Sequence, residues 1–104
     1  MRSLSFIVPV ACSLVLILSA SAYADVAAGQ SAYSAKGCIG CHGAGGKSVV
    51  PTYPSLAGQN ADFVRKSLTD FRSGARKNPI MNAMAAGLSD ADIGNLADYI
   101  DSLK

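Results

Sequence analysis

Only 80 of the 104 residues, Asp25 to Lys104, lie beyond an apolar N-terminal segment. A chain of this length has room for one domain, and its hydrophobic core is marginal unless disulfides, a metal or another bound group add to it. The 80 residues contain two cysteines, Cys38 and Cys41, which stand three positions apart and cannot form a framework of several disulfides. The sequence therefore predicts a single domain whose interior is completed by something other than its own side chains.

Residues 1–24 have the order of regions that is typical of a secretory signal peptide. Basic Arg2 precedes an apolar run from Leu4 to Leu18, and the segment ends in the tripeptide Ala22-Tyr23-Ala24. The alternative, a retained membrane anchor, needs about 20 apolar residues, which is more than this run provides. We expect cleavage after Ala24, and we expect Cys12 to leave with the leader.

The charge of the remaining 80 residues excludes one class of partner. Eight Lys and Arg side chains stand against seven Asp side chains, so the net charge is about +1. A nucleic-acid binding domain needs a basic stripe with interleaved aromatic residues, and the sequence has none. We therefore expect no nucleic-acid partner, and contact with a membrane only through other proteins.

Hydrophobic periodicity and capping residues predict helices. Residues 25–36 have apolar positions at helical spacing and stop before Gly37. Asn60 as N-cap and Gly74 just past the end delimit a second helix, Ala61–Ser73.

The clearest helix is the last one. Ser89 and Asp92 form a near match to a capping box, and the residues that follow recur on one helical face. Gly94 interrupts this helix without an evident reason in the sequence.

The segments between the predicted helices have the composition of loops. Residues 43–58 are rich in Gly and Pro and predict a long loop, and residues 75–79 predict an irregular stretch that leads into Ile80. Since no segment alternates like a strand, the predicted fold is all-α.

The segment Cys38-Ile39-Gly40-Cys41-His42 is the candidate site. Its spacing places two thiols on one turn, where each can add across a vinyl group of the same porphyrin while the adjacent imidazole reaches the iron. A dithiol redox motif would need a βαβ context, and a structural zinc site would need four ligands, of which the mature chain has two Cys and one His. The motif therefore favours covalent attachment of haem c through Cys38 and Cys41, with His42 as an iron ligand.

A methionine is the expected second axial ligand, because no other Cys or His remains. Met81 and Met84 are the two candidates after removal of the leader. A thioether opposite a histidine raises the reduction potential and suits an electron carrier. The alternative is that both methionines are ordinary core side chains.

Four short motifs and one methionine occur in a particular order. They are residues 38–43, residues 51–59, Met81, residues 88–90 and residues 96–100. This order resembles the class I c-type cytochromes, in particular the small bacterial periplasmic branch whose single-haem domains also occur fused in pairs in dihaem cytochromes. The resemblance covers essentially the whole of the expected mature chain. It implies the class I cytochrome c fold, in which three to five short helices wrap around one covalently bound haem, and a periplasmic location.

The resemblance also implies roles for single residues. The carbonyl of Pro54, twelve residues after His42, would accept a hydrogen bond from the second ring nitrogen of that ligand. Leu56 would pack against the haem on the same side. The methionine ligand of the family stands seven residues before the leucine that opens the last helix motif, which gives Met81, with Met84 as the second choice.

The resemblance implies structural roles for three further residues and offers two alternatives for a pair of basic residues. Gly29 would be the small residue where the first and last helices cross, with Tyr33 and Tyr99 beside it. Arg76 and Lys77 would either approach a haem propionate or simply be solvated.

The function implied is one-electron transport between redox proteins, such as donor and acceptor cytochromes, oxidases or reductases, through weak and transient docking. The chain itself would catalyse no reaction. Lys36 and Lys47 flank the cysteine motif and would either form a positive rim there or be merely solvated. Two alternatives are a haem c subunit of a larger oxidoreductase complex, and a sensor in which the methionine is displaced.

Overall fold

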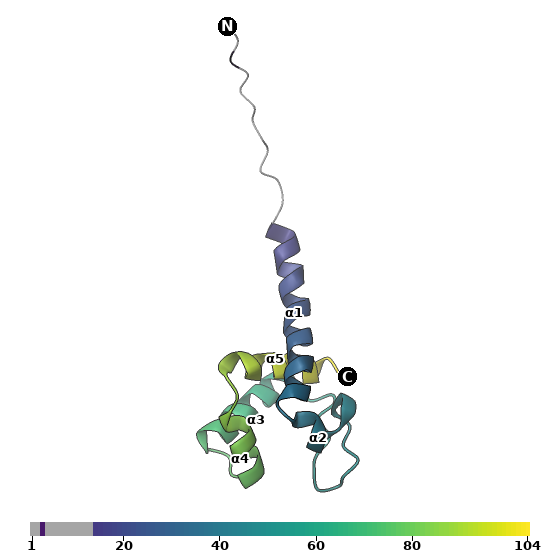
Figure 1. The fold of residues 1–104 in the computed structure, drawn as a ribbon, viewed down its shortest axis with the longest axis vertical. Helices are drawn as coiled ribbons and strands as arrows, with labels where there is room; N and C mark the ends of the chain where they lie inside the picture. Colours follow the sequence, from purple (N-terminus) through teal and green to yellow (C-terminus); the bar gives the residue numbers. More distant parts are fainter. Residues whose placement is uncertain (1–2, 4–13) are drawn as a thin grey trace.

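The computed structural model describes residue 3 and residues 14–104, and all regular structure in these residues is helical (Figure 1). The elements in chain order are α1 (Leu14–Ala35), α2 (Cys38–His42), the 3-10 turn η1 (Ala44–Gly46), α3 (Ala61–Ser73), α4 (Pro79–Ala86) and α5 (Asp90–Asp101). The prediction of an all-α fold is confirmed for this part of the chain.

Helix α1 is longer than the sequence predicted. The expected helix forms its C-terminal half, ends at Ala35, and is followed by Gly37 with a φ of 85°. Residues 14–24, the end of the proposed leader, continue the same helix and extend away from the other elements in Figure 1. None of the helices within residues 14–104 is long and apolar enough to cross a membrane. Cys12 and the beginning of the leader lie outside the described residues, so cleavage after Ala24 stays a prediction.

The crossing of α1 and α5 is the most extensive helix contact in residues 14–104, and the fold is built around it. Gly29 is buried there, and a Cβ atom at this position would lie 2.0 Å from the carbonyl oxygen of Asn95. One turn later Tyr33 is buried against Tyr99, with ring centroids 5.4 Å apart and tilted planes. The crossing therefore requires glycine at position 29, which is the role that the resemblance implied.

The buried core connects this crossing to the other helices. Helix α3 packs on α5 and on α4, and α1 packs on α5. The core side chains come mainly from α5 and are joined by one residue each from α1, α3, α4 and the connection between α4 and α5: Tyr33, Val64, Ala85, Leu88, Ile93, Leu96, Ala97, Tyr99 and Ile100. This small core lies on one side of the space described below as the candidate site.

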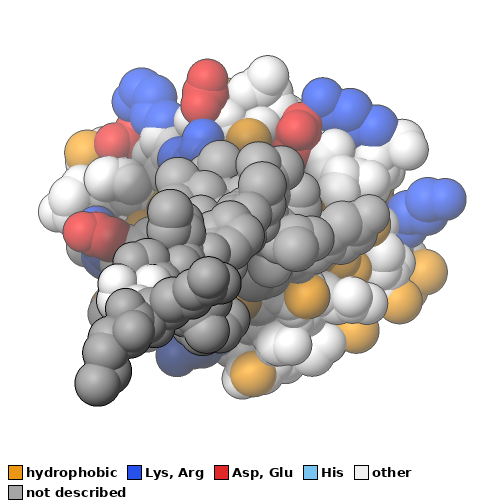
Figure 2. Space-filling model, turned by 90° about the horizontal axis from the view of Figure 1, so that it is seen from above, with side chains coloured by type: hydrophobic (Ala, Val, Ile, Leu, Met, Phe, Trp, Pro, Cys, Tyr) orange, Lys and Arg blue, Asp and Glu red, His pale blue; other side chains and the backbone are white. Residues whose placement is uncertain are grey.

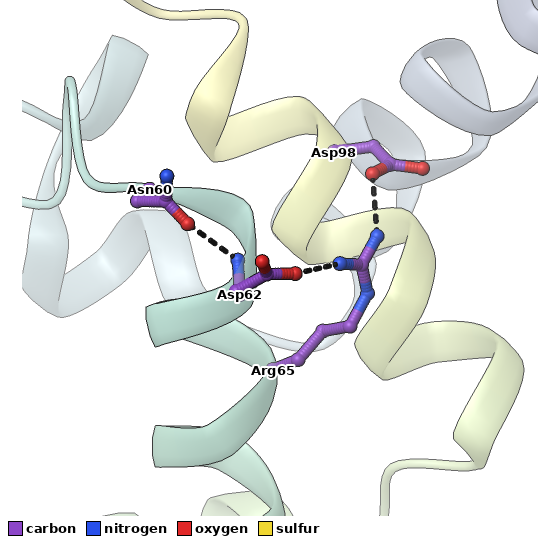
Figure 3. Close-up of polar contacts among 4 residues, drawn as sticks. All are labelled: Asn60, Asp62, Arg65 and Asp98. Atoms are coloured by element: carbon purple, nitrogen blue, oxygen red, sulfur yellow. Dashed lines mark hydrogen bonds and ion pairs between the residues drawn. The ribbon is translucent and has the colours of Figure 1, made fainter.

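Helix α3 has the predicted bounds because its caps act as expected. The side chain of Asn60 accepts a hydrogen bond from the Asp62 amide at 2.8 Å, and Gly74 has a φ of 84°. Arg65 then fastens α3 to α5, since its guanidinium donates to Asp62 and to Asp98, each at 2.9 Å (Figure 3). The caps thus fix the ends of α3, and Arg65 fixes its orientation on α5.

Helix α4 was not predicted. The irregular stretch expected over residues 75–79 ends one residue early, because Pro79 is the first residue of a helix that reaches Ala86. Asn78 is its N-cap and accepts from the amides of Ile80 at 3.1 Å and Met81 at 3.0 Å. Proline at the first helical position lacks only an amide that would be unpaired there. The Asn-Pro pair, which suggested a break, is therefore a helix start.

Helix α5 begins at the predicted capping box. Ser89 Oγ accepts from the Asp92 amide, and the Asp92 carboxylate accepts from the Ser89 amide, both at 3.0 Å. The hydrogen bond from the Ser89 amide holds the pKa of Asp92 below its usual value. The expected helix start is confirmed.

Gly94 lies in α5 at a point where a Cβ atom would meet nothing within 4 Å. Glycine inside a helix costs about 1 kcal/mol relative to alanine. We therefore expect Gly94→Ala to raise the free energy of unfolding by up to about 1 kcal/mol, measured by chemical denaturation of the holoprotein. A decrease in stability would contradict the open space that the structure has at this position.

The charged side chains are dispersed. Figure 2, seen from the end where α1 emerges, has Lys and Arg interspersed with Asp around the visible part of this face. Among the charged side chains of the molecule, Lys36 pairs with Asp92 at 3.7 Å and Arg72 with Asp90 at 2.6 Å. Exposed pairs of this kind contribute little to stability. The visible face therefore has no large patch of a single sign.

Candidate functional site

A cavity of ≈ 350 Å³ lies between α2, the loop that follows η1, α3, α4 and α5. The side chains that the sequence assigned to a cofactor all line it: Cys38, Cys41, His42, Pro54, Leu56, Met81 and Met84. The remaining walls are mostly apolar and come from α3 and α5: Phe63, Val64, Leu68, Phe71, Leu96 and Ile100. Segments far apart in the sequence thus converge on one largely apolar space.

Helix α2 presents both thiols to this cavity from a single helical turn. Cys38 and Cys41 are free and half-buried, and burial raises the pKa of the Cys38 thiol. Gly43 follows the turn with a φ of 86°, and a Cβ there would lie 1.9 Å from the Lys47 carbonyl oxygen. The chain can therefore reverse direction directly after His42 only with glycine at position 43.

Tyr33 of α1 holds the end of this turn through a hydrogen bond. Its buried hydroxyl donates to the Gly43 carbonyl oxygen at 2.6 Å. Burial raises the pKa of Tyr33 to about 12, with smaller contributions from Cys38 and Tyr99. The hydroxyl therefore remains a donor over the ordinary pH range and ties the motif to the α1–α5 crossing.

His42 is 7% exposed, and its Nδ1 lies 2.7 Å from the carbonyl oxygen of Pro54. A carbonyl oxygen can only accept, so Nδ1 is the donor. A neutral imidazole in this tautomer carries its free lone pair on Nε2, the form in which histidine binds a metal. The loop thus fixes both the tautomer and the orientation of the ring.

The loop that carries Pro54 is itself closed at its base. The Gly46 carbonyl oxygen accepts from the amides of Leu56 at 2.8 Å and Ala57 at 3.1 Å. Ser55 Oγ accepts from the Ser48 amide at 3.0 Å. Pro54 and Leu56 therefore sit on a segment that is hydrogen-bonded back to the residues just after the motif.

Both candidate methionines come from α4, on another wall of the cavity. Met81 is half-buried, whereas Met84 is 38% exposed. The ε-methyl group of Met84 lies near α2, 3.2 Å from the position that a Cβ on Gly37 would take. The more enclosed position of Met81 favours it as the side chain that faces a bound group.

Arg76 is the one charged residue among those that line the cavity. Its guanidinium lies 4.6 Å from the centre of the Phe71 ring and donates to Ser67 Oγ at 3.2 Å. Lys77 is exposed and not part of the lining, and neither are Lys36 and Lys47. Of the four basic residues that the sequence singled out, Arg76 is therefore the one that lines the cavity.

Sequence reasoning missed the polar part of the lining, which includes Gln59, Ser67 and Asn78. A signal for Ser67 was present, because it stands four residues from both Phe63 and Phe71 and so shares their helical face. Asn78 had no such signal, since its position depends on the unpredicted α4.

The residues present fit a haem. Two thiols on one turn, an imidazole with a defined free lone pair and a half-buried thioether surround a space with apolar walls. Within residues 14–104, no three or more His, Cys, Asp or Glu side chains are grouped so that they could hold a metal ion on their own.

A family model described as cytochrome c matches residues 26–104. The chain belongs to the cytochrome c family. Membership implies covalently bound haem c, and it favours the haem interpretation of the cysteine motif over the dithiol and zinc alternatives.

Two curated relatives show how this cytochrome c chain compares in length. It is 41% identical over 81 residues to cytochrome c-554(548) of Halomonas halodenitrificans, which covers 75% of this chain and 95% of that protein. It is 41% identical over 103 residues to a thiosulfate dehydrogenase electron acceptor of Stutzerimonas stutzeri, which covers 91% of this chain and 47% of that protein. The chain therefore spans nearly all of the first relative and about half of the second.

A solved structure agrees with the fold. The crystal structure of reduced recombinant cytochrome c4 from Pseudomonas stutzeri matches with a TM-score of 0.58 and 43% sequence identity. The match covers 62% of this chain and 36% of the other. The class I cytochrome c fold expected from the sequence is confirmed.

Proposed function

We propose that the mature chain, residues 25–104, is a periplasmic electron carrier with one haem c, bound through Cys38 and Cys41 and ligated by His42 and Met81. The convergence of these four side chains on one apolar cavity carries the proposal. The C-x-x-C-H motif occurs once in the sequence, which supports a single haem. Export follows from the leader, and it places the two thiols in an oxidising compartment.

When bound, haem c supplies an iron atom that alternates between the ferrous and ferric states. Cys38 and Cys41 hold the group to the chain, and Pro54 keeps the His42 ring in place through the 2.7 Å hydrogen bond to Nδ1. The apolar side chains of α3 and α5 exclude water, which favours the reduced state because it carries less charge. If His42 and Met81 both ligate the iron, they would leave it no open site for a substrate, and the chain would carry electrons without catalysing a reaction.

Partner docking is expected to be transient. Apolar side chains are partly exposed close to the site: Ile39 in the motif at 41%, and Ile80 and Met84 on the cavity wall at 51% and 38%. Small redox interfaces use such apolar contact without large buried area. Lys36 is already paired with Asp92, so exposed Lys47 is the basic residue beside the motif that could attract an acidic partner.

The alternative is that the chain is a haem subunit of a larger oxidoreductase complex. The relative in Stutzerimonas stutzeri is described as an electron acceptor of thiosulfate dehydrogenase, which is compatible with a dedicated enzyme partner. Size-exclusion chromatography of the protein from its source distinguishes the two. Elution as a free small protein supports the carrier, whereas a stable complex with a catalytic chain would support the subunit.

The ligand assignment is tested by comparing Met81→Ala with Met84→Ala. A six-coordinate ferric cytochrome with a methionine ligand has a weak near-infrared band. We expect Met81→Ala to lose this band and Met84→Ala to keep it, because Met84 is more exposed and lies against α2. Loss of the band in Met84→Ala alone would assign the ligand to Met84, and absence of the band in the wild type would favour the sensor alternative.

A further inference from the structure

Asn82, the residue after Met81, connects three separate segments near the start of α4. Its Nδ2 donates to the carbonyl oxygen of Phe71 at 2.8 Å and to that of Arg76 at 2.9 Å. Its Oδ1 accepts from the Asn78 amide at 2.9 Å. One half-buried side chain thus ties the last part of α3, the connecting loop and the cap of α4 to each other.

The connection extends to the backbone of Met81. Asn78, held through its amide by Asn82, accepts from the Met81 amide with its own side chain at 3.0 Å. The Asn82 amide also donates to the Asn78 carbonyl oxygen at 2.7 Å. The position of Met81 relative to α3 therefore depends on the bonds that Asn82 makes.

The other end of α4 is anchored independently. Arg72 donates to the Leu88 carbonyl oxygen at 3.1 Å and to Asp90 at 2.6 Å, and Ala85 and Leu88 are buried in the core. Removal of the Asn82 side chain should therefore loosen the first turn of α4, where Met81 lies, and leave its C-terminal end in place. The carbonyl groups of Phe71 and Arg76 would also lose their donor.

We propose that Asn82 is a positioning residue that keeps Met81 directed into the cavity and so limits the fraction of ferric protein in which this ligand has dissociated. The proposal rests on the proposed function, in which Met81 is the axial ligand. Residues around a metal ligand that fix its orientation commonly contribute about 10-fold or more to metal affinity or activity. Asn82 would fix the orientation of Met81 indirectly, through its hydrogen bonds to the backbone around the first turn of α4.

Binding of imidazole to the ferric holoprotein at one fixed pH tests the proposal, because imidazole can bind only where Met81 has left the iron. We expect Asn82→Ala to bind imidazole about tenfold more tightly than the wild type, because it removes all three hydrogen bonds of the side chain. Asn82→Asp keeps the shape of the side chain but removes both donors, and we expect it to change affinity in the same direction. This second variant keeps the test decisive if the alanine variant fails to fold.

The matched control is Asn60→Ala. It also removes a side-chain bond to a backbone amide, but at the far end of α3, and Asn60 does not line the cavity. We expect it to lower the midpoint of denaturation without changing imidazole affinity, which separates ligand positioning from general stability.

The imidazole affinities distinguish a failure of the role of Asn82 from a failure of the assignment of Met81 as the ligand. Equal imidazole affinity for Asn82→Ala, Asn82→Asp and Asn60→Ala, with much tighter binding by Met81→Ala, would overturn the role of Asn82 alone. If Met81→Ala binds imidazole no more tightly than the wild type, the ligand assignment fails, and the role of Asn82 fails with it.

Discussion

The variant that combines Cys38→Ala with Cys41→Ala is expected to lose covalent haem and to be largely unfolded. The cavity of ≈ 350 Å³ is bordered by much of the apolar surface of α3 and α5, and the buried core beside it is small. Without the group that fills this space, a domain of 80 residues has too little buried surface to offset the entropy of folding. Binding and folding are therefore coupled, as in small metalloproteins.

Two measurements check this expectation. Haem staining of a denaturing gel should be lost, and far-ultraviolet circular dichroism should lose most of its helical signal. Cys12→Ala is the matched control, because the third cysteine stands in the proposed leader and should leave both measurements unchanged. A cooperative thermal transition with native helix content in the stain-negative double variant would disprove the coupling.

Gly29→Val is expected to give a large loss of stability, although position 29 lies outside the cavity. Even a Cβ atom at this position would lie 2.0 Å from the Asn95 carbonyl oxygen and 2.7 Å from Tyr99 Cβ. Backbone atoms of a helix cannot move aside as a flexible side chain can, so α1 and α5 would have to separate. We expect the free energy of unfolding to fall by about 3 kcal/mol or more.

Chemical denaturation of the holoprotein measures this change, with Gly94→Ala as the comparison on the partner helix. Both glycines lie inside helices, but the first is enclosed by backbone and the second faces open space. Opposite signs of the change in stability are therefore expected. A Gly29→Val protein as stable as the wild type would mean that the two helices do not cross closely at this point.

The sequence predicted those elements whose signals are local. Asn60 and Gly74 delimit α3, and Ser89 with Asp92 starts α5, because a cap needs only residues within one turn of the helix end. Helix α4 was missed because Pro79 can either break a helix or begin one, and the choice depends on Asn78 bonding forward to the next amides.

The candidate site was predictable to a similar extent. The cysteine motif is contiguous, so the residues that would attach a haem could be named directly. Pro54 and Met81 required the spacing of a known family, since nothing near them in the sequence indicates that they share a cavity with His42. The bonds of Asn82 to Phe71 and Arg76 depend on how α3 and α4 pack, which no local pattern encodes.

The closed base of the loop after η1 separates its tip from the residues that hold His42. Val49 at the tip is 93% exposed, while the bonds of Gly46 and Ser55 close the loop behind it. The free energy of closing a loop rises only slowly with its length. Extra residues between Val49 and Val50 would thus be tolerated without displacing Pro54, which makes this tip the natural place to attach a label or an electrode linker.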